Sequence, residues 1–456
     1  MTQVHEAFSE TARERDPEGV LELLRRNPEL VDPKDETLLR WISDQCNPIV
    51  PVELRPVFER ARTSGGICER LALQKLASTA WYEGALNEAE AHWRDAARKG
   101  RESRDRLWLM ALNNLALMFV SQGRPFASLI AASSVPERAR EKDELRIEIF
   151  AEMMKARALG ELHEHDQAML RIEVARARAE SSSDSLIYNR VIILSTERDL
   201  LMMAERWNEA LARASELVTM PDRPLAEPVL LTDRAKLLLV RFELEPESAT
   251  EILRELEEIT ASEHLEGVWS QRLARELNLV RWRLAIRNGE SEAGESAGYQ
   301  LLEHLDGSGF GADLLTRALR VVSTYPEDST LRKDFETRAA DIVLERFSRS
   351  QRDRSRLADL GEPSESDWAI LANYQKALLG GTSSLRAAFA SRWKPGLEAY
   401  DLLVRDGHVA QCAWCGRIRT RVGEWMVSED ITSLVASGAM THGICVSCER
   451  AAEERN

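Results

Sequence analysis

The sequence predicts an all-α protein, built as a solenoid of helix pairs, that ends in a small C-terminal α+β module. Three observations support this prediction. Apolar and small residues recur at helical spacing in successive units between about residues 71 and 345, which is typical of stacked helical repeats. Proline and glycine residues punctuate these units. From Cys412 onward the periodicity changes: a period of two over residues 417–421 indicates a short strand, and Gly423 is expected to turn the chain into a second strand at Trp425.

The composition agrees with this class and excludes others. Of the 456 residues, 30% are charged, 44% are hydrophobic and 6% are aromatic, a balance typical of helix-rich, water-soluble proteins. The sequence has no apolar stretch of about 18 residues and begins without the pattern of a signal peptide, so we expect a cytoplasmic protein without membrane segments. The formal net charge of -15 disfavours nucleic acid as a partner, because binding to phosphates is mainly electrostatic.

Residues 1–70 are expected to form an N-terminal helical cap. The segment from Glu18 to Arg26 predicts a helix that ends at Asn27 and Pro28. Asp32 followed by Pro33 then predicts the N-cap and the first position of the next helix.

The first helix pair of the repeats shows the pattern most clearly. Small and apolar residues define the inward faces of its two helices: Leu76, Ala77 and Ala80 in the first, and Leu86, Ala89, Trp93 and Ala96 in the second. Gly84 lies where the turn between them is expected. This unit resembles the tetratricopeptide repeat. The resemblance implies a right-handed α-superhelix over residues 71–345 and a groove that holds a protein or peptide partner.

Later units carry the same pattern with weaker fidelity. Their diagnostic residues are, in order, Leu112, Leu115, Ala116, Phe119 and Gly123; Ala156, Leu159, Ala168, Ile172 and Ala175; Leu201, Trp207, Ala210, Ala214 and Leu217; Val240, Ala249, Leu253 and Leu256; and Leu284, Gly289 and Ala297. Prolines such as Pro136, Pro221 and Pro246 are expected to mark the connections between units.

Two segments flank the repeats. Residues 23–30 resemble the helical cap of bacterial tetratricopeptide proteins of the caspase-like CHAT group, but the protease domain that those proteins often carry has no counterpart here. Residues 346–408 predict a helical linker or capping segment. Within it, Ser364 or Ser366 is expected to cap a helix that runs through Trp368.

The C-terminal module, residues 409–456, contains the metal-binding pattern of the sequence. Two Cys-x-x-Cys pairs, Cys412 with Cys415 and Cys445 with Cys448, match the spacing of zinc ligands. Four thiolates leave no open coordination position, so we expect one structural Zn²⁺ per chain. His442 is a candidate second-shell or substitute ligand. Together, the expected strands and the two tight turns formed by the Cys-x-x-Cys pairs predict a zinc-ribbon-like module.

The same segment is similar to a tail found in bacterial signalling proteins. Residues 412–415, 423–425 and 442–448 resemble a short cysteine module at the C-terminus of many bacterial sensor kinases and response regulators. That module commonly has proline after its third cysteine, where this chain has Val446. The difference changes the rigidity of the knuckle and leaves the four ligands in place.

Three other groups of residues invite a functional interpretation. Arg417, Arg419 and Arg421 alternate along a predicted strand and are a possible contact for an anionic partner. His163-Glu164-His165-Asp166 lacks the spacing of a zincin helix and is expected in a turn. Cys46 and Cys68 are expected to be buried thiols of the core.

These features predict a non-enzymatic scaffold or adaptor in bacterial signalling or regulation. Its repeats would hold a protein or peptide partner, and its tail would carry a structural zinc ion. One alternative is a redox switch in which the four cysteines release zinc on oxidation. Another is a nucleic-acid-linked regulator that uses the three arginines of the zinc module. The sequence contains no phosphate loop, nucleophile elbow or other catalytic motif, so we do not expect an enzyme.

Overall fold

The computed structural model describes most of the helical part of the chain and four short strands. The described residues are 16–46, 49–181, 187–221, 227–263, 267–305, 311–339, 341–342, 346, 360, 364–370, 409–412, 418–419, 425–426 and 440–443. They belong to two compact units. One is composed of Met1–Met118, Ala131–Ala151 and Asp359–Gly361, and the other of Phe119–Ile130, Glu152–Ala358 and Glu362–Asn456.

The N-terminal segment is helical, as expected, but one cap differs from the prediction. Its elements are α3 (Pro17–Arg26), η1 (Pro28–Leu30), α4 (Glu36–Gln45), η2 (Val52–Leu54) and α5 (Arg55–Ala61). The N-cap of α4 is Asp35, whose side chain accepts the Leu38 N–H at 3.0 Å. Asp32 instead accepts the Lys34 N–H at 2.9 Å. This local turn competes with helix formation, and the helix therefore begins later.

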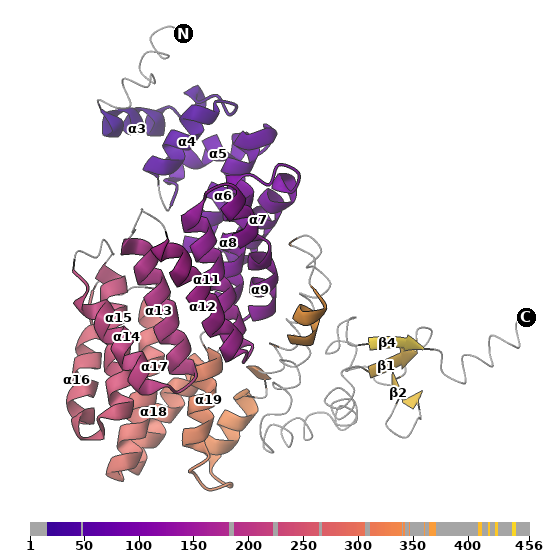
Figure 1. Ribbon diagram of the computed structural model, residues 1–456. Helices are drawn as coiled ribbons and strands as arrows, with labels where there is room; N and C mark the ends of the chain where they lie inside the picture. The colour runs from indigo at the N-terminus through magenta and orange to yellow at the C-terminus, as the bar shows by residue number, and fades with distance from the viewer. Residues whose placement is uncertain are drawn as a thin grey trace, which may run out of the picture. The chain divides into compact units, whose positions relative to one another are not determined.

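Successive helix pairs follow, and Figure 1 shows neighbouring helices lying side by side in the second unit. The pairs are α6 (Gly66–Tyr82) with α7 (Leu86–Gly100), α8 (Arg106–Ser121) with α9 (Pro125–Ser133), α11 (Leu145–Glu161) with α12 (His165–Glu180), α13 (Ile187–Met203) with α14 (Trp207–Thr219), α15 (Glu227–Leu244) with α16 (Ala249–Thr260), α17 (Gly267–Asn288) with α18 (Ser291–His304), and α19 (Gly311–Val322) with helical residues 330–339. The prediction of an all-α repeat fold is confirmed.

Two short elements lie between or inside these pairs. They are α10 (Val135–Glu141) and η3 (Pro246–Ser248). Pro246 begins η3 inside the α15–α16 pair, so the expectation that it marks a connection between units is wrong. Pro136 does lie between two pairs, in the first turn of α10. Proline is tolerated there, since the backbone N–H that it lacks would have no partner inside the helix.

The turn between the two helices has the same geometry in five of the pairs. One residue has a positive φ angle, and it is Gly84, Gly123, His163, Glu205 or Gly289. The next residue donates its N–H to the carbonyl five positions earlier, as in Ala85 to Ala80 at 2.8 Å and Glu164 to Leu159 at 2.9 Å. This is the Schellman motif, which closes the first helix and reverses the chain. His163 therefore lies in a turn, as predicted.

Small residues allow the helices to approach closely. A β-carbon on Gly160 of α11 would lie 2.3 Å from the Leu200 side chain of α13. In α17, Trp282 is completely buried, its ring centroid lies 4.9 Å from that of Phe335, and its Nε1–H donates to the Tyr325 hydroxyl at 3.0 Å. The core of the second unit thus continues from α17 to the last described helix pair.

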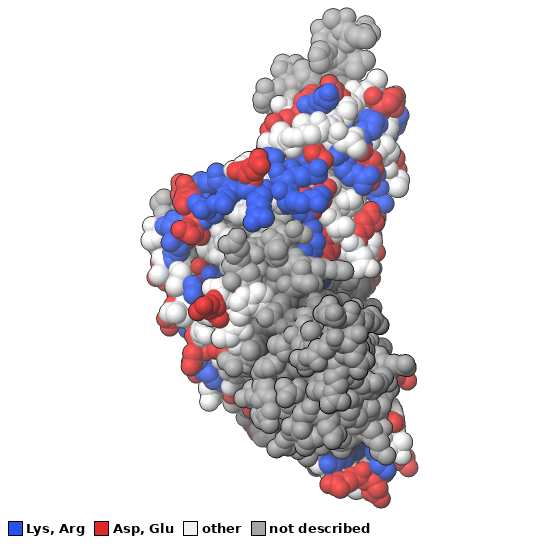
Figure 2. Space-filling model, turned by 90° about the vertical axis from the view of Figure 1, so that its right-hand side faces the viewer, with Lys and Arg blue, Asp and Glu red and all other residues white. Residues whose placement is uncertain are grey.

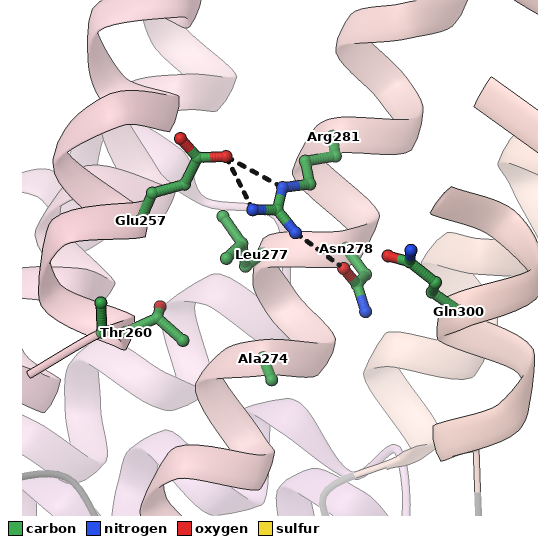
Figure 3. A pocket seen from close by; sticks show the side chains of 8 residues that line it. Glu257, Thr260, Ala274, Leu277, Asn278, Arg281 and Gln300 are labelled. Atoms are coloured by element: carbon green, nitrogen blue, oxygen red, sulfur yellow. Dashed lines mark hydrogen bonds and ion pairs between the residues drawn. The ribbon is translucent and has the colours of Figure 1, made fainter. Parts of the chain in front are cut away.

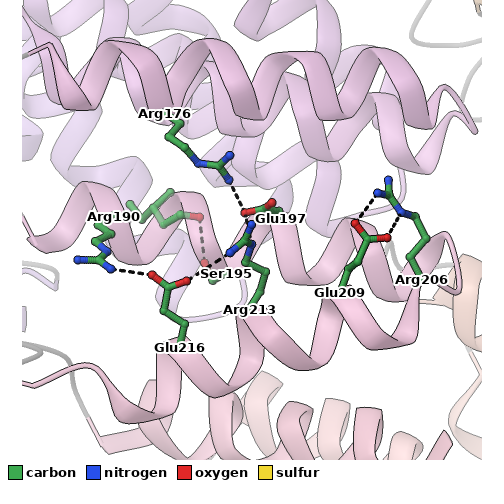
Figure 4. Close-up of polar contacts among 9 residues, drawn as sticks. Arg176, Arg190, Ser195, Glu197, Arg206, Glu209, Arg213 and Glu216 are labelled. Atoms are coloured by element: carbon green, nitrogen blue, oxygen red, sulfur yellow. Dashed lines mark hydrogen bonds and ion pairs between the residues drawn. The ribbon is translucent and has the colours of Figure 1, made fainter. Parts of the chain in front are cut away.

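Ion pairs also connect consecutive pairs of helices (Figure 4). Glu197 of α13, only 4% exposed, accepts from Arg176 of α12 at 2.5 Å and lies 3.0 Å from Nε of Arg213 in α14. Arg190 and Glu216 connect α13 with α14 at 2.7 Å. These contacts fix the relative position of three helices that follow one another in the chain.

The C-terminal segment contains a four-stranded sheet, drawn in yellow in Figure 1. The strands are β1 (Val409–Cys412), β2 (Ile418–Arg419), β3 (Trp425–Met426) and β4 (Met440–Gly443), in the order β3-β2-β1-β4. β1 pairs antiparallel with β2 and parallel with β4, so that Gln411 is opposite His442 and Cys412 is opposite Gly443. The predicted strands around Ile418 and Trp425 are confirmed, whereas β1 and β4 were not predicted as strands.

The remaining expectations concern the linker and the membrane. Ser364 caps the helical residues 365–370, because its hydroxyl accepts the Asp367 N–H at 3.3 Å while its own N–H donates to the Asp367 carboxylate at 2.8 Å. Among the described helices, none combines the length and apolarity needed to cross a bilayer. The boundaries predicted for the four domains stay predictions.

Candidate functional site

A pocket of about 360 Å³ opens between α16, α17 and α18 (Figure 3). The residues that line it are Glu257, Thr260, Ala261, Ala274, Leu277, Asn278, Arg281 and Gln300. Its volume is in the range of a single large side chain or of a short stretch of main chain. The pocket is therefore large enough to receive part of a peptide.

A clamped guanidinium forms one wall of this pocket. Nε and Nη2 of Arg281 donate to the same Glu257 carboxylate oxygen at 3.0 and 2.7 Å. Nη1 of Arg281 lies 3.4 Å from Oδ1 of Asn278, which accepts from it. The guanidinium and the carboxylate are both about two-fifths exposed, so this pair orients the wall and contributes little to stability.

Asn278 is the most unusual residue of the lining. Its side chain is only 6% exposed, yet its amide nitrogen donates no hydrogen bond to the described residues around it and is directed into the pocket beside Arg281 (Figure 3). Gln300 extends its carboxamide from α18 on the opposite side. The amide nitrogen opens to solvent in the pocket, so a polar group of a ligand would replace the water that it otherwise binds.

The chemistry of the pocket is that of binding. Leu277 and Ala274 supply an apolar floor. The hydroxyl of Thr260 donates to the Leu256 carbonyl of its own helix at 2.7 Å. The described lining residues include no cysteine, histidine or lysine. Two carboxamides that both donate and accept hydrogen bonds suit a neutral polar group such as a peptide unit.

Sequence analysis did not single out these residues. Asn278, Arg281 and Glu257 look like ordinary polar positions of amphipathic helices, and no local motif distinguishes them. Glu257 and Gln300 are brought to Asn278 only by the packing of α16 and α18 against α17.

The predicted metal ligands lie largely outside the described residues. Cys412 ends β1, and the register places it opposite Gly443, two positions before Cys445 in the sequence. His442 is in β4. Cys415, Cys445, Cys448, Arg417 and Arg421 are not among the described residues, and Arg419 is described as part of β2. Within the described set, no group of His, Cys, Asp or Glu side chains could hold a metal ion.

The two cysteines outside the module are buried, as predicted. Cys46 is 5% exposed and Cys68 is 6% exposed. Burial raises the pKa of the Cys46 thiol, although Lys75 and Arg25 oppose the increase. The Cys68 thiol donates to the Lys34 carbonyl at 3.5 Å. Both thiols are therefore held in the protonated, unreactive form at neutral pH.

Charge is unevenly distributed over the surface. Figure 2 shows Lys and Arg side chains gathered in one band on the face that it displays, with Asp and Glu side chains around it. The negative net charge of the chain thus coexists with a local basic surface. Acidic groups of a partner can be attracted to such a band even when the whole protein is anionic.

Comparison with known proteins yields similarity of structure and not of sequence. No protein-family model matches the sequence, and no curated protein matches it. Among solved structures, the crystal structure of a Rap protein in complex with Competence and Sporulation Factor is similar, with a TM-score of 0.46 and 13% sequence identity. The alignment covers 82% of this chain and 97% of the Rap chain.

Proposed function

We propose that this protein is a non-enzymatic binding protein whose helical repeats hold a peptide or a protein segment. The observation that carries this proposal is the Asn278 amide nitrogen, which opens to solvent in the pocket between α16, α17 and α18 and donates to none of the described residues. A peptide unit of the ligand would accept from Asn278 and exchange hydrogen bonds with Gln300. Helices that are already packed lose little entropy when a ligand binds to them.

The proposed cellular role is that of a scaffold or adaptor in bacterial signalling. It is supported by the resemblance of the C-terminal cysteine segment to the tails of bacterial sensor kinases and response regulators. It is also supported by the lining of the pocket, where Asn278, Gln300 and Arg281 offer hydrogen-bonding groups to a ligand. The repeats would select the partner, and the C-terminal tail would bind a second partner or transmit a signal.

The binding proposal is tested by selecting peptides from a random library on the full chain. We expect enriched peptides that bind with micromolar dissociation constants, and we expect Asn278→Ala to weaken them about tenfold, since one buried hydrogen bond is worth about 1.4 kcal/mol. Asn288→Ala is the matched control, because Asn288 is at the end of the same helix and makes only an exposed contact with Glu290 at 3.4 Å.

Two outcomes would contradict the binding proposal. One is a selection that enriches no peptide above background on correctly folded protein. The other is a set of peptides whose affinities are the same for Asn278→Ala and for Asn288→Ala, because the pocket would then not be the binding site.

We further propose that Cys412, Cys415, Cys445 and Cys448 hold one structural zinc ion. The parallel pairing of β1 with β4 supports this proposal. Parallel strands end at the same edge of a sheet, and each Cys-x-x-Cys pair begins at or just after the C-terminal end of one of these strands. His442 is proposed as a second-shell or substitute ligand.

Zinc content distinguishes this proposal from the redox alternative. Protein purified under reducing conditions should contain about one zinc per chain by elemental analysis, and the Cys412→Ser/Cys445→Ser variant should contain none. The Cys46→Ala/Cys68→Ala variant should retain its zinc. Metal-free protein with four rapidly reacting thiols would instead favour the thiol switch, and salt-sensitive binding of oligonucleotides would favour the nucleic-acid alternative.

A further inference from the structure

The pocket between α16, α17 and α18 contains hydrogen-bonding groups whose donor or acceptor character is fixed by their neighbours. The guanidinium of Arg281 can only donate. Its contact with Oδ1 of Asn278 at 3.4 Å therefore directs the oxygen of that carboxamide toward Arg281 and the amide nitrogen into the pocket (Figure 3). The Thr260 hydroxyl donates its proton to the Leu256 carbonyl at 2.7 Å. Asn278 thus presents a donor to the pocket, whereas the oxygen of Thr260 can only accept.

Gln300 supplies groups of both kinds from the neighbouring helix. It belongs to α18, is exposed, and extends its carboxamide across the pocket from Asn278 (Figure 3). No hydrogen bond to the described residues occupies this carboxamide. A primary carboxamide has a carbonyl oxygen and two N–H groups, so Gln300 can donate to one ligand group and accept from it at the same time.

The charges around the pocket favour a neutral ligand group. Arg281 and Glu257 neutralise each other, because Nε and Nη2 of Arg281 both donate to Oε1 of Glu257, and the other lining residues are uncharged. Thr260 ends α16 and Ala261 caps it, so the negative end of the helix dipole lies at the pocket and disfavours a carboxylate. An ammonium group could not accept from Asn278.

An Asn or Gln side chain satisfies more of these groups than the main chain of a peptide does. A trans peptide unit has one N–H, which points away from its own C=O. A side-chain carboxamide carries its C=O and one N–H side by side, and it has a second N–H. It can therefore exchange two hydrogen bonds with Gln300, accept from Asn278 and donate to Thr260.

We propose that this pocket is specific for a primary carboxamide, the end of an Asn or Gln side chain of the bound peptide. The inference rests on the peptide-binding function proposed above and adds the chemical group that the pocket selects. Gln300 would form a cyclic pair of hydrogen bonds with the ligand carboxamide, and Asn278 and Thr260 would satisfy its remaining oxygen lone pair and N–H. Leu277 and Ala274 would contact the CH₂ groups of the ligand side chain.

Equilibrium dialysis of the full chain against five peptide mixtures tests this specificity. Each mixture contains acetylated pentapeptides with a free C-terminal carboxylate. The central residue is Gln, Asn, Glu, Lys or Met, and the flanking residues are randomised without Asn and Gln. We expect the Gln or the Asn mixture to be retained at least about tenfold more strongly than the Glu, Lys and Met mixtures, because each of these lacks one or more of the hydrogen bonds.

The deciding variant is Gln300→Glu, whose carboxylate can accept hydrogen bonds but cannot donate them. Gln300 is exposed, so the substitution should not unfold the protein. The variant should retain the Lys mixture more strongly than the Gln mixture, a reversal that a loss of stability could not produce. Gln45→Glu is the matched control, since Gln45 is also exposed and belongs to α4, outside the pocket. It should keep the preference for carboxamides.

The possible results distinguish this specificity from peptide binding itself. Equal retention of the five mixtures would overturn the carboxamide specificity and leave peptide binding intact. A carboxamide preference that persisted in Gln300→Glu would also overturn it, because the preference would then arise outside this pocket. Retention of no mixture would overturn the specificity, and the binding proposal would fail with it only if the peptide selection also enriched nothing.

Discussion

At the scale of single residues, the repeat turn shows how one backbone position constrains the sequence. Gly84, Gly123 and Gly289 adopt positive φ angles without a steric penalty, whereas His163 and Glu205 adopt the same conformation with a β-carbon. A left-handed conformation costs a non-glycine residue about 1–2 kcal/mol. The chain tolerates this cost because the Schellman hydrogen bonds and the packing of the two helices determine the turn.

Replacing Glu205 by glycine should stabilise the protein. The change removes the left-handed strain and loses an ion pair with Arg320, which is exposed on both sides and so contributes little. We expect a gain of about 0.5–1 kcal/mol after the entropy cost of glycine is included, measured by urea denaturation.

The opposite change at Gly84 is the control for this prediction. A β-carbon on Gly84 would meet no atom within 4 Å, so Gly84→Ala tests the backbone conformation without a steric clash. It should destabilise the protein by about 1 kcal/mol. If Glu205→Gly did not raise the free energy of unfolding and Gly84→Ala did not lower it, the left-handed conformation of the turn would not limit stability.

At the scale of helices, a buried group of four charged side chains connects α13 with α15. Arg198, only 2% exposed, donates to Asp233 at 2.5 Å and to Asp199 at 2.8 Å. Lys236 donates to Asp199 at 2.5 Å. Burial alone would lower the pKa of Arg198, but Asp199 and Asp233 outweigh it and raise the pKa. Arg198 therefore stays charged inside the protein, and its hydrogen bonds link it with Asp199, Asp233 and, through Asp199, Lys236.

Removing one member of this group should cost far more than removing a surface pair. Arg198→Met leaves the buried Asp233 carboxylate without its principal partner, and we expect a loss of about 3–5 kcal/mol in the free energy of unfolding. Arg198→Met/Asp233→Leu should recover much of that loss, because Asp199 and Lys236 still form a pair.

An exposed pair provides the comparison for the buried group. Arg206→Met removes the contact of Arg206 with Glu209 on α14 and should change the urea midpoint very little. If the single and double substitutions at Arg198 and Asp233 were equally destabilising, the four charges would not act as a coupled group.

At the scale of the whole molecule, the main helix contacts join elements that follow one another in the chain. In the second unit these contacts run from α12 to α13, α14, α15, α16, α17 and α18. A protein stabilised by contacts between neighbours unfolds in parts, since a local defect weakens only the adjacent repeats. We therefore expect each free-energy change predicted above to act mainly on the repeats around the substituted residue.

Trp282→Ala tests this expectation. The substitution removes a completely buried ring that contacts Phe335 and Tyr325, and such a change typically costs about 3–5 kcal/mol. Hydrogen exchange should show lost protection in α17, α18 and residues 330–339, with protection of α6 and α7 unchanged. Uniform loss of protection along the chain would indicate a single cooperative unit.

Much of the fold can be predicted from sequence because its signals are local. Helical periodicity around Trp93 and Ala168, the glycines at 84, 123 and 289, and the cap at Ser364 all act within a few residues of one another. Prediction from local patterns failed where two residues of one segment both favour the start of a helix. Asp32 and Asp35 both suit a helix start, and the turn at Lys34 decided between them.

The sequence by itself determined the repeated helix pairs, the position of their turns and the cysteine pattern of the tail. Only the tertiary structure decided which distant side chains meet: Arg281 with Glu257 beside the pocket, Trp282 with Phe335 in the core, and Arg198 with Asp233 in the protein interior. The physical reason is distance along the chain. Residues within one turn of a helix are brought together by backbone geometry alone, whereas these groups are brought together by the stacking of separate helices, which depends on packing over the whole length of each helix.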